Sequence, residues 1–213
     1  MLRAFLFDMD GTLIDTEVLW VEATETYLRT EGYAPRHEEV LADVYGVAGH
    51  ELRENIQRRY PNLVGDEDAL YQIFLELRAQ RDLMIPGSVQ LLRDLARDYP
   101  VALVSGSGRD DVAAGVAHMG ISDCLAFTLD ESCYHPGKPD PVCFRMAAER
   151  LEVPPESCLV FEDSQVGVAA AKRAGMHCVA LARPDRPPQD LSQADVVLEN
   201  LGDFDVADYV SQI

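Results

Sequence analysis

The stretch Arg3-Ala4-Phe5-Leu6-Phe7-Asp8-Met9-Asp10-Gly11-Thr12 begins as a short apolar run and ends in two carboxylates and a glycine. A short apolar run bounded by a turn signal is typical of a buried strand, and the glycine lets the backbone turn. Asp8 stands at the last strand position, and after the turn Asp10 can face the same cavity. The pair predicts a fixed nucleophile or metal ligand beside a proton carrier.

A solvated turn and a calcium loop are the alternative interpretations of this pair. The EF-hand pattern is contradicted, because Gly11 comes too early and the twelfth position counted from Asp8 is Leu19 rather than Glu.

Similar apolar runs recur along the chain and alternate with helical patterns. The runs are Val101–Ser105, Leu125–Leu129, Cys158–Glu162, Cys178–Leu181 and Asp195–Leu198. The helical patterns are Ser88–Arg97, Arg109–Met119, Pro141–Leu151 and Gln165–Ala174, the last closed by Gly175. This alternation predicts an α/β fold with a Rossmann-like parallel sheet and helices on both faces.

Residues 15–83 break this rhythm and contain no convincing buried strand. They predict four helices in succession, Thr16–Thr30, Glu38–Val44, Glu51–Tyr60 and Asp66–Arg81. We therefore expect an all-helical cap domain at 15–83, inserted after the first strand of a core formed by 1–14 and 84–213. An insert at this point lies over the carboxyl ends of the strands, where open α/β sheets bind ligands, so we expect a lid hinged near Ile14–Asp15 and Asp82–Pro86.

Composition limits the classes of function. The 213 residues are 47% hydrophobic and 26% charged, as in ordinary soluble globular proteins. The formal net charge of −19 disfavours nucleic acids and anionic membrane surfaces as partners. No apolar run approaches the roughly 18 residues of a membrane span, and Asp8 comes too early for a signal peptide, so we expect a cytoplasmic protein. The five cysteines lack metal or redox spacing and predict reduced thiols.

Two further loops carry polar groups to strand ends. Ser105-Gly106-Ser107-Gly108 follows an apolar run and opens a helix, so it can aim a hydroxyl and free N–H groups at an anion. A plain helix-capping turn explains the same letters. Lys138 lies in Gly137-Lys138-Pro139-Asp140-Pro141, a stiffened loop, where the alternatives are surface charge and a local cation for a phosphate.

The run Cys158–Glu162 ends in an acid, and Asp163 and Ser164 follow it directly, so that Glu162 and Asp163 are adjacent carboxylates. Adjacent carboxylates are unfavourable unless they are solvated, protonated or bound to a cation, and a divalent metal is the economical explanation. The alternative is that Asp163 or Ser164 only caps the next helix. Because four strand–loop junctions deliver such groups to one edge of one sheet, we expect a functional site there.

These motifs, taken in order, resemble the haloacid dehalogenase-like hydrolases that carry a helical cap after the first strand. The similar branch contains sugar-phosphate phosphatases and β-phosphoglucomutase. Asp8-Met9-Asp10-Gly11-Thr12-Leu13 looks like the first family motif, Ser105 the second, Lys138 the third, and Glu162-Asp163-Ser164 with Gly167 the fourth.

The resemblance implies a phosphatase in which Asp8 attacks phosphorus to form an aspartyl-phosphate and Asp10 protonates the leaving alcohol and then activates water. It implies that Mg²⁺ is held by Asp8, the backbone carbonyl of Asp10 and Asp163, with Glu162 behind the ligands. Ser105, Lys138 and the backbone N–H groups after Asp8 and at Gly106 would stabilise the transferring phosphoryl group.

The same resemblance leaves the substrate open among small phosphorylated metabolites such as hexose, gluconate and polyol phosphates. Trp20 stands where the mutase has a cap histidine, and the loop Gly46–His50 has glycine where the mutase has a phosphate-binding arginine; both departures disfavour the mutase alternative. Trp20 is either core or a platform for a sugar face. His50, Arg53 and Arg78 are further candidates for substrate selection.

A phospho-acceptor receiver-like domain is the non-enzymatic alternative, and dehalogenation of a 2-haloacid is the other enzymatic one. Receivers lack a helical insert of this size, and a metal-free dehalogenase has no use for a second aspartate at Asp10. We expect a monomer or weak dimer.

Overall fold

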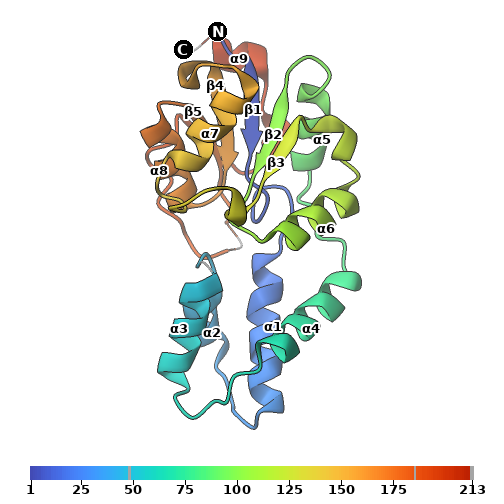
Figure 1. The fold of residues 1–213 in the computed structure, drawn as a ribbon, viewed down its shortest axis with the longest axis vertical. Coiled ribbons are helices and arrows are strands. Elements are labelled where there is room, and N and C mark those ends of the chain that lie inside the picture. Colours follow the sequence, from blue (N-terminus) through green and yellow to red (C-terminus); the bar gives the residue numbers. More distant parts are fainter. Residues whose placement is uncertain (48, 185, 212–213) are drawn as a thin grey trace. The chain divides into compact units, whose positions relative to one another are not determined.

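The computed structural model describes residues 1–47, 49–184 and 186–211. Within these residues, six strands form one sheet, and every adjacent pair in it is parallel (Figure 1). The strands are β1 (Ala4–Phe7), β2 (Val101–Val104), β3 (Phe127–Leu129), β4 (Cys158–Glu162), β5 (His177–Leu181) and β6 (Val196–Leu198).

The strand order β3-β2-β1-β4-β5-β6 places β1 between β2 and β4. The chain therefore builds the sheet first to one side of β1 and then to the other, and open α/β sheets bind ligands at the carboxyl ends of the strands beside such a reversal. Phe7 pairs with Leu103 of β2 and with Phe161 of β4. The residues that follow these three positions consequently emerge side by side at one edge of the sheet.

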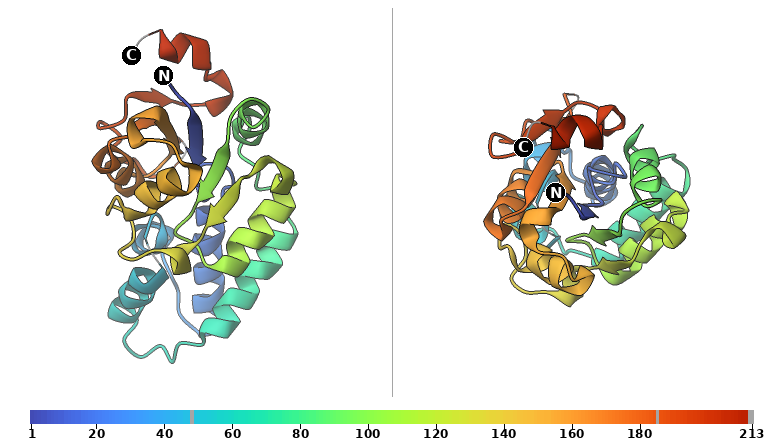
Figure 2. Two further views of the ribbon diagram at one scale, coloured as in Figure 1. Left: turned by 45° about the horizontal axis from the view of Figure 1, so that its top comes forward. Right: turned by 90° about the horizontal axis from the view of Figure 1, so that it is seen from above.

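Helices cover both faces of the sheet, with α7 and α8 on one side and α5 and α6 on the other (Figure 2). The helices of this unit are α5 (Ser88–Leu95), α6 (Arg109–Met119), α7 (Val142–Leu151), α8 (Gln165–Ala174) and α9 (Val206–Val210). Phe144 of α7 packs in one cluster with Leu6 and Val104 of the sheet. On the other face, the Phe161 ring stacks on Phe7 at 4.5 Å. Burial of each such side chain contributes about 1.5–3 kcal/mol, which fixes the strands that carry the site.

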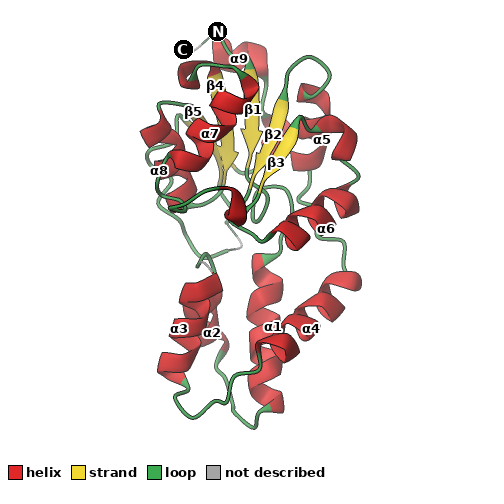
Figure 3. Cartoon of the chain, in the orientation of Figure 1, coloured by secondary structure: helices red, strands yellow, loops and turns green. Residues whose placement is uncertain are grey.

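The insert Asp15–Leu83 is a compact unit of its own, separate from the unit formed by Met1–Ile14 and Met84–Ile213. Its described residues form helices joined by loops (Figure 3). The helices are α1 (Glu17–Thr30), α2 (His37–Val44), α3 (Gly49–Arg59) and α4 (Glu67–Ala79). Leu28 of α1 and Val40 of α2 are fully buried in its core. Asp66 caps α4, since its Oδ1 accepts the Ala69 N–H at 3.0 Å.

The predicted α/β class and the parallel sheet with helices on both faces are confirmed. Each predicted end of these elements lies within two residues of the observed one, and half of the ends coincide. For example, α7 begins at Val142 rather than Pro141, because the Asp140 carboxylate accepts the Val142 N–H at 3.0 Å and closes the turn before the helix. The short helix α9 was not predicted. Across the described ranges, no helix is both long and apolar enough to cross a membrane.

Candidate active site

Asp8 directly follows β1 at the carboxyl edge of the sheet, where its backbone N–H donates to the Phe161 carbonyl at 3.0 Å. This bond extends the β1–β4 ladder by one residue and fixes the direction of the side chain. Only 6% of Asp8 is exposed. Its Oδ1 accepts a hydrogen bond from Lys138 Nζ at 2.6 Å. The carboxylate is thus held at one end by its strand and at the other by a cation.

Lys138 is shared between two carboxylates. Its Nζ donates to Asp8 and, at 2.6 Å, to Glu162 Oε1, and it also donates to the Val104 carbonyl at 3.2 Å. Nζ lies 5.2 Å from the centre of the Phe144 ring, and only 9% of the side chain is exposed. Burial acts to lower the pKa of Lys138, but Asp8 and Glu162 outweigh burial and hold its pKa well above the usual value. The lysine therefore stays charged.

Glu162 connects this lysine to the start of α8. While Oε1 binds Lys138, Oε2 accepts the N–H groups of Asp163 at 3.1 Å and Ser164 at 3.2 Å, and the Ser164 hydroxyl at 2.9 Å. The exposed N–H groups at a helix N-terminus favour an anion at this place. The Ser164 hydroxyl in turn accepts the Gly167 N–H at 3.0 Å and caps the helix. The capping interpretation of Ser164 is correct, and Glu162 has a separate role in holding Lys138.

Asp163 lies against the turn that follows β1. Its Oδ1 accepts the Thr12 hydroxyl at 3.1 Å, and both residues are buried. Gly11 has φ +83°, and a Cβ there would approach the Asp163 carboxylate closer than 3.0 Å. Glycine is thus required at this position for two reasons, its backbone conformation and the close approach of the carboxylate.

Asp8, Glu162 and Asp163 each offer a carboxylate oxygen to a group that spans no more than 4.8 Å. Burial raises the pKa of Asp8 well above its usual value; Glu162 and Asp10 add to the rise, and Lys138 opposes it. One lysine against these acids leaves excess negative charge in a buried place. Oxygen donors with excess negative charge are the set that a hard divalent cation such as Mg²⁺ prefers, so the residues fit the metal.

Asp10 lies at the same edge and meets the loop after β2. Its Oδ2 accepts the Ser105 hydroxyl at 3.1 Å and the Ser107 hydroxyl at 2.7 Å. Ser105 is fully buried, and its carbonyl accepts the hydroxyl of Tyr134 at 2.7 Å, which anchors the loop. Gly106 is exposed, and a Cβ there would meet no atom within 4 Å. The space beside its backbone is open.

The structure therefore brings the predicted residues of the α/β unit to one sheet edge. These are Asp8, Asp10, Ser105, Gly106, Lys138, Glu162 and Asp163. Three contributors were given no role from the sequence: Thr12, Ser107 and Tyr134. The sequence position of Thr12 and Ser107 could have indicated their roles, since each follows a motif carboxylate or hydroxyl by two residues. No sequence pattern around Tyr134 predicts its hydrogen bond to the Ser105 carbonyl.

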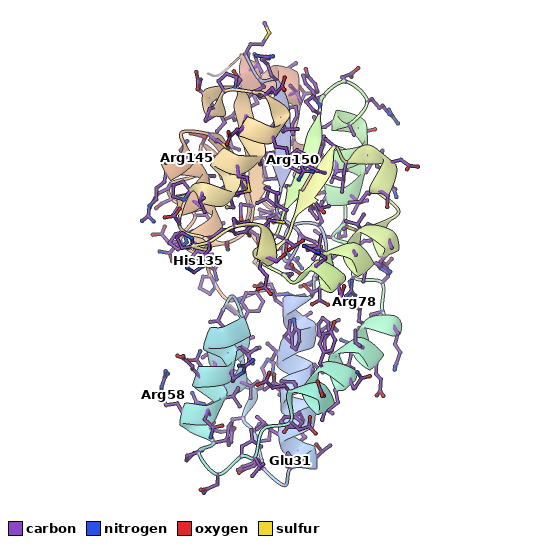
Figure 4. All side chains as sticks on the ribbon, in the orientation of Figure 1. Glu31, Arg58, Arg78, His135, Arg145 and Arg150 are labelled. Carbon is purple, nitrogen blue, oxygen red and sulfur yellow. The ribbon has the colours of Figure 1, made fainter. Side chains whose placement is uncertain are left out.

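The candidates for substrate selection lie in the helical unit and make contacts within that unit or lie on its helices. Trp20 is half-buried and stacks on Phe74, with ring centres 4.0 Å apart. Arg53 is exposed and pairs with Glu67 at 2.7 Å. Arg78 is half-buried on α4 (Figure 4). The side chain of His50 lies outside the described part of the structure.

Comparisons with known proteins agree with this geometry. A family model described as haloacid dehalogenase-like hydrolase matches residues 2–175. The chain is 35% identical over 209 residues to a probable pseudouridine-5'-phosphatase of Drosophila melanogaster, covering 93% of this chain and 90% of the relative. It is 30% identical over 201 residues to hexitol phosphatase A of Escherichia coli, covering 93% and 91%.

Solved structures share the fold. CbbY from Rhodobacter sphaeroides, solved as a variant in complex with xylulose-(1,5)bisphosphate, is 25% identical with a TM-score of 0.80, covering 95% of this chain and 96% of that one. A putative β-phosphoglucomutase from Thermotoga maritima covers 100% of both chains with a TM-score of 0.81, and at 22% identity it shows the fold alone. The chain therefore belongs to the haloacid dehalogenase-like hydrolases, as one of their phosphatases.

Proposed function

We propose that this enzyme is an Mg²⁺-dependent phosphatase that hydrolyses a small phosphate monoester, of a sugar or sugar acid, through an aspartyl-phosphate on Asp8. The observation that carries the proposal is the buried Asp8 carboxylate held by Lys138 in a group of acids, with Asp10 two residues further on. Membership of the family excludes the receiver-like alternative.

In the first step, a carboxylate oxygen of Asp8 attacks phosphorus. The new P–O bond to Asp8 forms while the P–O bond to the alcohol breaks, and Asp10 gives its proton to the leaving oxygen. Lys138 supplies a fixed positive charge, and the Ser105 hydroxyl and the Gly106 N–H supply hydrogen bonds to the phosphoryl oxygens. Phosphoryl transfer depends on such positioning and electrostatic stabilisation.

In the second step, water attacks the same phosphorus. Asp10, now ionised, takes a proton from that water, and the P–O bond to Asp8 breaks to release phosphate and the free Asp8 carboxylate. A single carboxyl group can act first as acid and then as base because the first step leaves it in the form that the second step needs.

The metal would be held by the side chains of Asp8 and Asp163 and by the backbone carbonyl of Asp10. When bound, Mg²⁺ supplies positive charge that offsets the repulsion between the acids and the phosphate. Glu162 has both oxygens hydrogen-bonded to Lys138 and to the start of α8, and this supports a role in holding Lys138 rather than the metal.

The names of relatives support a hydroxyl-rich phosphate ester as substrate. Besides the two phosphatases above, the chain is 31% identical to a validoxylamine A 7'-phosphate phosphatase of Streptomyces hygroscopicus, with 94% of this chain covered. Within the helical unit, Trp20, His50, Arg53 and Arg78 remain our candidates for selecting among such esters.

The proposal is tested by phosphate release from a panel of hexose, hexitol, sugar-acid and nucleoside monophosphates, with Mg²⁺ and with excess chelator. We expect metal-dependent release from one ester class and none from Asp8→Asn, which keeps the shape of the side chain but is a poor nucleophile. The panel includes β-glucose 1-phosphate with a readout for glucose 6-phosphate. Release that survives chelation, or conversion of this ester to the 6-phosphate, would overturn the proposal.

A further inference from the structure

The Asp10 carboxylate accepts hydrogen bonds from two serine hydroxyls of one short loop. Ser107 Oγ donates to Asp10 Oδ2 at 2.7 Å, and Ser105 Oγ donates to the same oxygen at 3.1 Å. The Ser107 N–H donates to Ser105 Oγ at 3.0 Å. The Ser107 carbonyl accepts the Glu131 N–H at 3.0 Å, which ties the loop to the short helix Glu131–Cys133 that follows β3. The loop therefore presents both hydroxyls to one carboxylate oxygen in a fixed arrangement.

The two hydroxyls do not have the same freedom during the reaction. A hydroxyl has one proton to donate. In the function proposed above, the Ser105 hydroxyl donates its proton to a phosphoryl oxygen. While it does so, it cannot donate a hydrogen bond to Asp10. Ser107 has no such competing task, and its hydrogen bond to Asp10 is the shorter of the two.

We infer that Ser107 is the positioning residue of Asp10: its hydroxyl holds the Asp10 carboxyl for proton transfer while the Ser105 hydroxyl serves the phosphoryl group. The inference rests on the proposed function, in which Asp10 is the proton carrier. Ser107 touches no reacting atom and acts through Asp10. A carboxyl without this anchor can rotate away from the leaving oxygen, and the step that needs its proton slows.

The chemistry supplies a selective readout. An alkyl phosphate leaves as an alkoxide, which needs a proton as the P–O bond breaks. A p-nitrophenyl phosphate leaves as p-nitrophenolate, which is stable without one. Loss of the Asp10 anchor should therefore slow formation of the aspartyl-phosphate from an alkyl ester much more than from the aryl ester. A merely structural defect would slow both alike.

The test measures alcohol release in a single turnover with enzyme in excess, from 2-deoxyglucose 6-phosphate or the best alkyl ester of the panel and from p-nitrophenyl phosphate. For Ser107→Ala we expect about a five- to tenfold loss on the alkyl ester, the range for a hydrogen bond between neutral groups because Asp10 carries its proton in this step, and less than about a twofold loss on the aryl ester. Ser107→Thr restores the hydroxyl and should restore the rate. If the alanine variant folds poorly, Ser107→Cys replaces it. The cysteine side chain keeps about the same volume but is a weak hydrogen-bond donor, so this variant should show the same selective loss.

Three reference variants separate the possible failures. Ser122→Ala, at an exposed serine of the turn Ser122–Cys124, is the matched control and should match the wild type on both esters. Ser105→Ala should weaken both esters alike, and if Ser107→Ala did the same, Ser107 would be a phosphate ligand and the inference would be wrong. Asp10→Asn should show the selective loss in stronger form, about 10²–10⁴-fold. A selective loss in Asp10→Asn without one in Ser107→Ala overturns the inference alone, whereas no selectivity in Asp10→Asn overturns the proposed role of Asp10.

Discussion

A methyl group at Gly167 tests the arrangement around Glu162. Gly167 lies in α8, where replacing glycine by alanine ordinarily stabilises a helix by about 1 kcal/mol. Here a Cβ would approach the Glu162 carboxyl carbon and both carboxyl oxygens closer than 3.0 Å. The carboxylate must therefore move, and with it the anchor of Lys138. We expect Gly167→Ala to lower both stability and activity.

The loss of stability expected for Gly167→Ala follows from the hydrogen bonds that the Glu162 carboxylate makes. The displaced carboxylate, 1% exposed, has bonds of 2.6 Å to Lys138 Nζ and 2.9 Å to Ser164 Oγ. Removing one partner of a buried ion pair costs about 3–5 kcal/mol, and overpacking costs about 1–3 kcal/mol. Because the carboxylate shifts rather than vanishes, and the helix gains from alanine, we expect a net loss of about 2–4 kcal/mol. Each 1.4 kcal/mol of lost transition-state stabilisation lowers kcat about tenfold.

A double-mutant cycle isolates this contact. In the Glu162→Ala background the three atoms that the new methyl group meets are gone, so Gly167→Ala should be neutral or slightly stabilising there. Urea unfolding and kcat are measured for the four proteins, with Gly65→Ala as the control, because a Cβ on Gly65 meets no atom within 4 Å. Equal stability of Gly167→Ala and the wild type, or a coupling energy near zero, would refute the placement of Glu162.

Three further predictions concern other parts of the chain. Thr12→Val removes the hydroxyl that donates to Asp163 at 3.1 Å, and we expect the Mg²⁺ concentration for half-maximal activity to rise about tenfold or more; an unchanged metal titration would contradict this role. Burial raises the pKa of both Cys143 and Cys158 to about 11, so iodoacetamide at about pH 8 should leave these two thiols unmodified in the folded protein, and peptide mapping that finds either one alkylated would count against their burial. Burial acts to raise the pKa of Glu25, but hydrogen bonds from His37 and Arg29 more than offset burial and hold the pKa below its usual value. Because folding favours the ionised form, this contribution is complete above about pH 4.3 and is lost as pH falls through the lowered pKa. Glu25→Gln should therefore be less stable than the wild type at about pH 6, by less than about 1 kcal/mol since the partners are exposed, and the difference should disappear at about pH 3; a difference that persists at low pH would show that the charge is not its cause.

The position of the site could be predicted from the sequence because its strands are short and apolar, and because polar residues stand at or directly after their ends. Each of β1, β2 and β4 is buried along its whole length, and Asp8, Ser105 and Asp163 come directly after them. Since parallel strands end at one edge, three local patterns were enough to bring distant residues together.

Partnerships between elements could not be predicted in this way. Lys138 was expected as a cation for phosphate, but that it also bridges Asp8 and Glu162 depends on the loop reaching across two strands. The second hydroxyl on Asp10, from Ser107, looks like an ordinary turn residue in the sequence. Trp20 stacks on Phe74 only because α1 and α4 pack together. The helix α9 has five residues, too few for a periodic pattern to appear.

The account depends most on Asp8 as the atom that receives the phosphoryl group. The direct measurement is acid quenching of the enzyme during turnover of a ³²P-labelled ester with Mg²⁺, followed by peptide mapping. We predict label on the peptide that carries Asp8, released by hydroxylamine as an acyl phosphate is, and no label in Asp8→Asn. Full turnover with no label on the protein, or label on another residue, would contradict the account.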